Sequence, residues 1–82
     1  MTTEEIYARL TDVMRDVFDD EALEIAPTTN AEDVSGWDSQ AHITLIVATE
    51  VRFGIRFRTA EVESLKNVGE LVQLIAKKSA AA

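Results

Sequence analysis

The sequence predicts an all-α fold, a four-helix bundle of three longer helices and one short third helix. Apolar residues recur at helical spacing in three long segments, so each segment has one apolar face to bury. Thr, Asp or Asn residues, which cap helices well, stand at the start of these segments. With 82 residues the chain is long enough for one small domain. We assign residues 1–82 to it, with an ordered core over about 3–77 and a frayed end over 79–82.

The first helix is expected to open at Thr2 and to run to about Phe18. Thr2 and Glu5 have the Thr-x-x-Glu spacing of a capping box, in which each side chain satisfies a backbone N–H of the other residue. The inner stripe of this helix consists of Ile6, Leu10, Val13, Met14 and Val17. Charged residues occupy the other side, as expected for a helix that is packed on one face.

A long connection follows over residues 19–38, and a connection of this length needs anchors in a compact domain. We expect its apolar residues to supply them: Leu23, Ile25, Val34 and Trp37. Thr29 and Glu32 repeat the capping-box spacing, which predicts a short helical turn over 30–33. The acidic run at 19–21 lacks the alternating acids and central glycine of a calcium loop, so we interpret it as a solvated turn.

The second helix is expected to begin at Asp38-Ser39 and to end at Phe53. Gly54 follows directly, and glycine is the usual residue in the left-handed position that ends a helix. We assign the apolar residues Ile43, Leu45, Ile46 and Phe53 of this helix to the core. Val47 is expected to be exposed.

Residues 55–58 are interpreted as a loop in which Ile55 and Phe57 are anchors, because no partner strand exists elsewhere in the chain. Thr59 is expected to cap a short third helix that reaches about Ser64. Asn67 is expected to cap the fourth helix, with a glutamate three residues later. The inner stripe of the fourth helix consists of Val68, Leu71, Val72 and Ile75.

Composition excludes several classes of function. The chain has no cysteine, which excludes a disulfide framework, a thiolate metal site and a cysteine nucleophile. Its net charge of −7 argues against nucleic acid as a partner and favours basic protein surfaces. No signal peptide and no stretch of membrane-spanning length is visible, so we expect a soluble cytoplasmic protein without membrane insertion. We assign no metal site and no catalytic residue.

Several segments resemble those of the acyl carrier protein family. The run Gly36-Trp37-Asp38-Ser39-Gln40-Ala41-His42-Ile43 resembles the family's attachment segment, in which Asp-Ser-Leu stands at the start of the second helix. Glu50-Val51-Arg52-Phe53-Gly54-Ile55 resembles the family's acidic helix end followed by Phe-Gly-Ile. Thr59-Ala60-Glu61-Val62 and Leu65-Lys66-Asn67-Val68-Gly69-Glu70-Leu71-Val72 are similar to its third and fourth helices. The similarity extends from the first helix to Ile75, and it implies an acyl-carrier-like bundle.

The resemblance implies that Ser39 receives 4'-phosphopantetheine from a phosphopantetheinyl transferase, and that the thiol of this arm carries an acyl group. Asp38 would help to position the Ser39 segment in the transferase. A serine in the first turn of a helix suits a phosphodiester, because free N–H groups and the helix dipole favour an anion there. The carrier itself breaks no bond, so we expect no enzyme activity. An acyl-loading enzyme and a ketosynthase or acyltransferase would be its further partners, and a freestanding monomer is the expectation.

This sequence departs from the family pattern in two places. Gln40 stands where the family has leucine, at a position that faces partners. The second helix is also less acidic than the family's, with Val51 and Arg52 in place of typical acids. These departures favour a dedicated carrier for a specialised lipid or polyketide pathway over a housekeeping fatty-acid carrier. The predicted partner-binding residues are Gln40, His42, Val47, Glu50, Val51 and Glu61.

Two polar residues of the second helix admit other interpretations. His42 lies three residues after Ser39, so a Ser–His nucleophile pair is conceivable, but it would need an orienting group and an oxyanion hole. A surface histidine that contacts partners or the arm is the better interpretation. Thr49 matches a usually apolar inner position in the family. Our hypothesis is that it alters the polarity of an acyl-binding cavity.

Two alternatives remain open from the sequence. One is a peptidyl or aryl carrier, against which the acidic composition argues mildly. The other is an unmodified helical interaction domain that shares the fold without the chemistry, in which Ser39 would be dispensable. An enzyme is the weakest option, because no set of nucleophile, base and cleft is visible.

Overall fold

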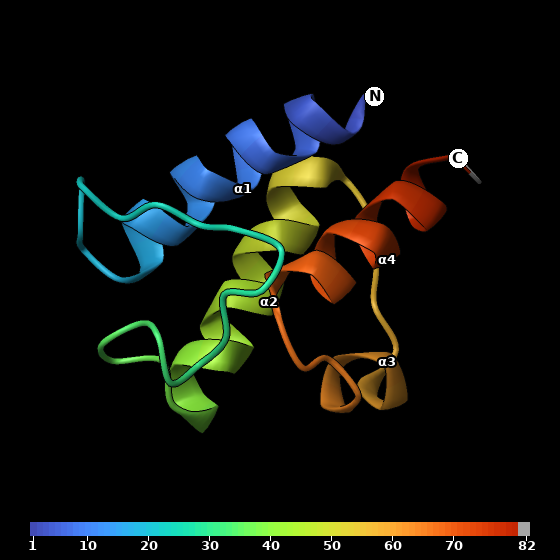
Figure 1. Cartoon of the computed structure of the whole chain (residues 1–82). Coiled ribbons are helices and arrows are strands. Elements are labelled where there is room, and N and C mark those ends of the chain that lie inside the picture. Colours follow the sequence, from blue (N-terminus) through green and yellow to red (C-terminus); the bar gives the residue numbers. More distant parts are fainter. Residues whose placement is uncertain (81–82) are drawn as a thin grey trace.

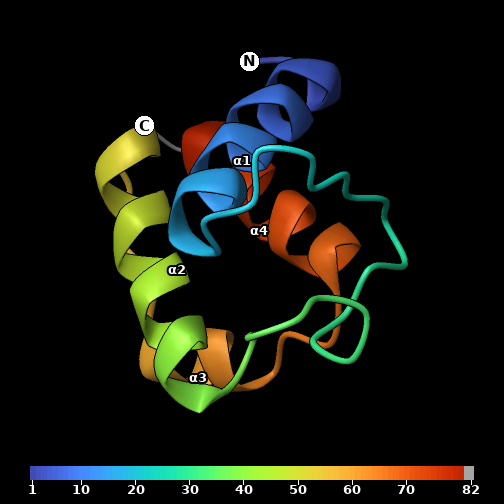
Figure 2. The same cartoon turned by 90° about the vertical axis from the view of Figure 1, so that its left-hand side faces the viewer.

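The computed structural model describes residues 1–80 and contains the helices α1 (Thr3–Val17), α2 (Ser39–Phe53), α3 (Thr59–Glu63) and α4 (Val68–Ala80). No strand occurs within these residues, so the predicted all-α class is confirmed. Helix α1 packs against both α2 and α4, and the short α3 lies beside the first half of α2 (Figure 1). The long connection after α1 leaves the bundle on the side away from α2 and then returns to the start of α2 (Figure 2).

The helix ends follow the residues that cap them. The capping box of Thr2 and Glu5 is present, with the Glu5 N–H donating to the threonine hydroxyl at 3.1 Å. The hydrogen bonds from Thr2 hold the pKa of the Glu5 carboxyl below its ordinary value. Asp38 caps α2, and Gly54 ends it in the left-handed conformation with φ of 66°. These caps fix α1 and α2 to within a residue of the bounds predicted from sequence.

The core lies where the three longer helices meet. Its buried hydrophobic residues are Ile6, Leu10, Val13, Met14, Val34, Leu45, Ile46, Ile55, Val68, Leu71, Val72 and Ile75. Full burial of one such side chain contributes about 1.5–3 kcal/mol to stability. The predicted inner stripe of α4 is buried throughout, and that of α1 is buried apart from Val17, which is partly buried against the core.

The prediction that Ile43 of α2 belongs to the core is wrong. Ile43 is 63% exposed, although Leu45 and Ile46 are buried and Phe53 packs against the core. On a helix, position 43 lies between the directions of positions 46 and 47, so its residue type alone does not decide which side it joins. In the structure it continues the exposed side of Val47, one helical turn away.

The long connection is anchored as expected, and its short turn lies over the predicted residues 30–33 but is closed by a different pair of side chains. Val34 is buried, and Leu23, Ile25 and Trp37 pack against the core. The turn is closed by Asn30 and Asp33, whose side chains each accept a backbone N–H of the other residue. The predicted Thr29–Glu32 pair does not form. The hydroxyl of Thr29 instead accepts the Ala26 N–H at 2.8 Å.

Backbone hydrogen bonds join this connection to the first turn of α4. The N–H groups of Val68 and Gly69 donate to the carbonyls of Thr29 and Pro27, each at 2.8 Å. A β-carbon on Gly69 would lie only 2.8 Å from the Pro27 carbonyl oxygen, so glycine permits this close approach. Two of the four N–H groups that a helix start leaves unsatisfied are thereby used to fix a loop.

Helices α3 and α4 differ slightly from their predicted bounds. Arg58, not Thr59, occupies the capping position of α3, and its N–H donates to the Glu61 carboxylate at 2.8 Å. Asn67 caps α4 as expected by accepting the Glu70 N–H. Helix α4 includes 79 and 80, where a frayed end was expected, and residues 81 and 82 of that tail lie outside the described residues.

Candidate functional site

Ser39 is the first residue of α2, and its side chain is exposed. Asp38 sets the helix start, because its side chain accepts the Ala41 N–H at 2.8 Å and its carbonyl accepts the His42 N–H at 2.9 Å. The structure gives the backbone N–H groups of Ser39 and Gln40 no acceptor among the residues it describes. Ser39 therefore presents a hydroxyl on a rigid helix start, beside two amides that can donate to an anion.

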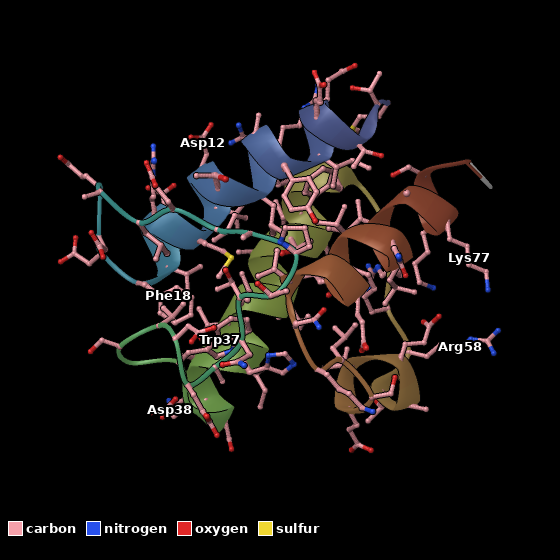
Figure 3. The ribbon with its side chains drawn as sticks, viewed as in Figure 1. Asp12, Phe18, Trp37, Asp38, Arg58 and Lys77 are labelled. Carbon is pink, nitrogen blue, oxygen red and sulfur yellow. The ribbon has the colours of Figure 1, made fainter. Side chains whose placement is uncertain are left out.

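Trp37 and His42 form a clamp across this helix start. The indole Nε1–H donates to His42 Nδ1 at 3.1 Å, and the two ring planes are nearly parallel, at 20°, with centroids 6.0 Å apart. These residues occupy the positions just before the cap and four residues after it, where a packed pair commonly fixes the entry of the chain. Trp37 also packs on Phe18 from the end of α1, at a centroid distance of 5.8 Å (Figure 3). Trp37 is thus the loop anchor that the sequence predicted.

His42 extends the clamp to α3. Since Nδ1 accepts from Trp37, the ring proton belongs on Nε2, which faces the Val62 carbonyl at 3.4 Å. Both ring nitrogens are engaged within the bundle, so neither is positioned to take a proton from Ser39. The Ser–His nucleophile pair is not supported by this geometry. His42 is partly buried, and its role in the structure is to join α2 to the neighbouring helix.

A groove of about 710 Å³ runs from Ser39 between α2, α3 and the start of α4. Its lining combines apolar and polar side chains: Ala31, Trp37, Asp38, Ser39, His42, Ile43, Thr59, Val62, Glu63, Leu65, Lys66, Asn67 and Leu71. The volume falls within the usual range of small-molecule pockets. A flexible group attached to the Ser39 hydroxyl has this groove as its nearest sheltered surface.

The remaining predicted partner-binding residues differ in their surroundings. Gln40 is exposed, and Val47 and Val51 are 53% and 79% exposed. Glu50 is partly buried, and its carboxylate accepts the Phe57 N–H at 2.9 Å. This bond holds the segment after α2 against the bundle, so one carboxylate oxygen of Glu50 already has a structural role.

Glu61 is also engaged within the chain. Its carboxylate is 2.8 Å from the Lys78 ammonium and 2.8 Å from the Arg58 N–H. The hydrogen bond from Lys78, followed by that from the Arg58 backbone, lowers the pKa of the Glu61 carboxyl below its ordinary value. Glu61 therefore ties the start of α3 to the end of α4.

Thr49 is fully buried, and its hydroxyl donates to the Leu45 carbonyl at 2.7 Å. It is inside the bundle, as predicted from the sequence. It does not line the groove beside Ser39, and its polar atom is satisfied within α2. The hypothesis that Thr49 alters the polarity of an acyl-binding cavity between the helices stays a prediction.

Sequence reasoning missed the hydrogen bond between Trp37 and His42 and the place of Lys66 at the groove. The spacing of Trp37 and His42 around the Asp38 cap was the available signal for their contact. Lys66 and Asn67 reach the groove only because the connection between α3 and α4 turns back toward α2, which no local pattern predicts.

Two further properties concern the part of the chain that the structure covers. None of the helices in residues 1–80 is long and apolar enough to cross a membrane. No group of three or more His, Cys, Asp or Glu side chains is placed there to hold a metal ion.

Comparisons with known proteins give the family. The family described as "Phosphopantetheine attachment site" matches residues 8–75, most of the chain. The chain belongs to this family. An acyl carrier protein of Acidothermus cellulolyticus is 30% identical over 82 residues, covering 100% of this chain and 98% of the relative. The meromycolate extension acyl carrier protein of Mycolicibacterium smegmatis is 30% identical over 76 residues, covering 93% of this chain and 77% of the relative.

The comparison with solved structures gives the same family. The holo acyl carrier protein from Geobacter metallireducens has a TM-score of 0.86 at 43% identity, covering 92% of this chain and 86% of that one. As an acyl carrier protein, the chain holds acyl intermediates as thioesters on covalently attached 4'-phosphopantetheine, in fatty-acid, specialised lipid or polyketide biosynthesis. Proteins of this family are carriers, and they interact with a phosphopantetheinyl transferase and with synthesis enzymes.

Proposed function

We propose that Ser39 is the residue to which the phosphopantetheine arm is attached. The observation that carries this proposal is the exposed hydroxyl of Ser39 at the first position of α2, on the rim of the groove of about 710 Å³. The arm ends in a thiol, which supplies the thioester chemistry. The residues of this chain hold and orient the arm.

The surroundings of Ser39 fit a phosphodiester. The amides of Ser39 and Gln40 lie at the positive end of the α2 dipole, where a negative charge is favoured by about 0.3–1 kcal/mol. Asp38 is exposed and fixes the helix start. We assign to it the second role of positioning this segment in the transferase.

The less acidic α2 favours a dedicated pathway over general fatty-acid synthesis. Among the charged residues of α2, Glu50 is committed to the Phe57 N–H and Arg52 adds a positive charge. We therefore propose a specialised lipid or polyketide pathway, with a loading enzyme and a ketosynthase or acyltransferase as partners. The carrier acts there as a cytoplasmic monomer without catalytic activity of its own.

The test is the intact mass of the protein after incubation with coenzyme A and a broad-specificity phosphopantetheinyl transferase. The wild-type chain is expected to gain one phosphopantetheinyl group, and Ser39→Ala is expected to gain none. Ser35→Ala provides the matched control, because Ser35 is an exposed serine in the adjoining loop. A mass gain that persists in Ser39→Ala, or that disappears in Ser35→Ala alone, would refute the assignment.

A further inference from the structure

The three lysine side chains of this chain have different surroundings. Lys78 is paired with the Glu61 carboxylate at 2.8 Å. Lys77 is exposed, points away from α2 and lines a hollow beside α3 and α4 (Figure 3). Lys66 is the lysine that lines the groove beginning at Ser39. The groove therefore contains one primary amine.

The backbone at Lys66 is fixed, whereas its side chain is not held. The Lys66 N–H donates to the Glu70 carboxylate at 2.9 Å, and the next residue, Asn67, caps α4. Lys66 is exposed, and its side chain forms no ion pair within residues 1–80. The amine therefore stays at the wall of the groove and is available there for a reaction.

The property that distinguishes Lys66 in the groove is its chemical reactivity, not its charge. Asp38 and Glu63 line the same groove, so the charges of its lining are mixed. A neutral lysine amine, however, attacks carbonyl carbon. His42 is the other nitrogen nucleophile in the lining, and both of its ring nitrogens are engaged within the bundle. A reactive carbonyl group in this groove would therefore meet Lys66 as its nitrogen nucleophile.

We propose that Lys66 is acylated by the thioester that the chain itself carries. This inference rests on the proposed attachment of the arm at Ser39. The Lys66 Nζ lone pair attacks the thioester carbonyl carbon, so that a C–N bond forms and the C–S bond breaks. The sulfur leaves as a thiolate and takes up the proton that the nitrogen releases. The products are an amide on Lys66 and the free thiol of the arm, and no further reactant enters the step.

Attachment to the same chain favours this transfer over reaction with a free thioester. A flexible tether gives a roughly millimolar effective concentration, which is about a hundredfold above free acyl-CoA at about 10 μM. The transfer does not reverse, because an amide is more stable than a thioester. It also removes the positive charge that Lys66 contributes to the groove. Acylated Lys66 would therefore mark a carrier that stayed loaded for a long time without being unloaded by an enzyme.

The test uses the full chain, loaded with a hexanoyl arm by a broad-specificity phosphopantetheinyl transferase and hexanoyl-CoA. Free hexanoyl-CoA is removed, and the protein is held at about pH 8.5, because a higher pH raises the share of neutral lysine amine. Hydroxylamine then cleaves the remaining thioester and leaves an amide intact. Mass spectrometry of peptides is expected to find the retained hexanoyl group on Lys66 at least about tenfold more often than on Lys77.

Variants separate transfer within the chain from other routes. Lys66→Arg keeps the positive charge but stays protonated, so it is expected to load normally and to lose the retained hexanoyl group. Lys77→Arg is the matched control and is expected to leave the acylation of Lys66 unchanged. Ser39→Ala, mixed with free hexanoyl-CoA at about 10 μM, is expected to acylate Lys66 at least about tenfold more slowly. Dilution of the loaded wild-type protein is expected to leave the rate unchanged, because the step is intramolecular.

Two kinds of result would overturn the proposal. Equal acylation of Lys66 and Lys77 would indicate a reaction that depends on exposure alone. A rate that rises in proportion to protein concentration would indicate transfer between chains. The intact mass before the hydroxylamine step reports separately on loading. A wild-type chain that gains no arm removes both proposals, whereas a loaded chain whose Lys66 stays unmodified removes only this one.

Discussion

The two ends of α2 are held in very different ways. At its start, Asp38 caps the helix, and His42 is bonded to Trp37 and faces the Val62 carbonyl. Toward its end, Val47 and Val51 have most of their surface in solvent. A carrier needs its attachment residue in a fixed place, but its partners must bind and leave. If Ser39 carries the arm and Val47 and Val51 contact partners, as predicted, one helix separates these tasks along its length.

The largest expected effect comes from removing the Asp38 cap at the start of α2. Asp38→Ala is expected to lower the free energy of unfolding by about 1–2 kcal/mol, because the Ala41 N–H loses its acceptor. Asp38→Asn keeps a capping oxygen and is expected to remain within about 0.5 kcal/mol of the wild type. Urea denaturation followed by circular dichroism measures both. Equal losses in the two variants would show that the charge of Asp38 matters more than its capping bond.

The second-largest expected effect concerns the contact between Trp37 and His42. His42→Phe keeps a ring beside Trp37 but removes the acceptor of the indole N–H, which is expected to cost about 1 kcal/mol. Faster amide hydrogen exchange is also expected in α3, because the variant loses the contact with the Val62 carbonyl. Thr44→Val is the control, since Thr44 is exposed and bonds only within α2. Similar exchange in α3 for the two variants would contradict a joining role for His42.

The exposed residues in the second half of α2 are expected to tolerate substitution. Val51→Ser is expected to alter the free energy of unfolding by less than about 0.5 kcal/mol, because Val51 is 79% exposed. A loss of stability as large as that of Asp38→Ala would remove the contrast between the two ends.

The smallest expected effect is a pH dependence of stability that arises from Glu61 in α3. The Glu61 carboxyl has a folded pKa below its ordinary value of 4.5, mainly because of its hydrogen bond with Lys78. Its contribution to stability is therefore present above pH 4.5 and is lost as the pH falls through the lowered folded pKa. Glu61→Gln is expected to show a shallower fall of Tm below pH 4.5 than the wild type in thermal scans. An identical fall in the two proteins would argue against the ion pair in solution.

Local sequence patterns predicted the elements well. Thr2, Asp38 and Asn67 each use a side-chain oxygen to cap a helix, and Gly54 ends one by adopting a positive φ. These signals act over three or four residues, so they are readable without knowledge of the packing. The exposure of Ser39 also follows from its place in the first turn of α2.

The errors arose where the outcome depends on contacts between distant segments. Ile43 was assigned to the core because of its residue type, but no neighbouring helix covers it. Glu50 and Glu61 stay predicted partner-binding residues. The sequence did not predict that their carboxylates also bond to the Phe57 N–H and to Lys78, because these contacts depend on how the segments after α2 fold back.

The hydrogen bonds from Val68 and Gly69 to the long connection bear on the order in which the protein is assembled during synthesis. The connection that leads to Ser39 precedes α4 by some forty residues, yet its carbonyls at Pro27 and Thr29 are satisfied by the first turn of that helix. The first turn of α4 must therefore have left the ribosome before this part of the proposed attachment platform is complete. A modifying enzyme that requires the finished platform acts only after residues 68 and 69 have emerged.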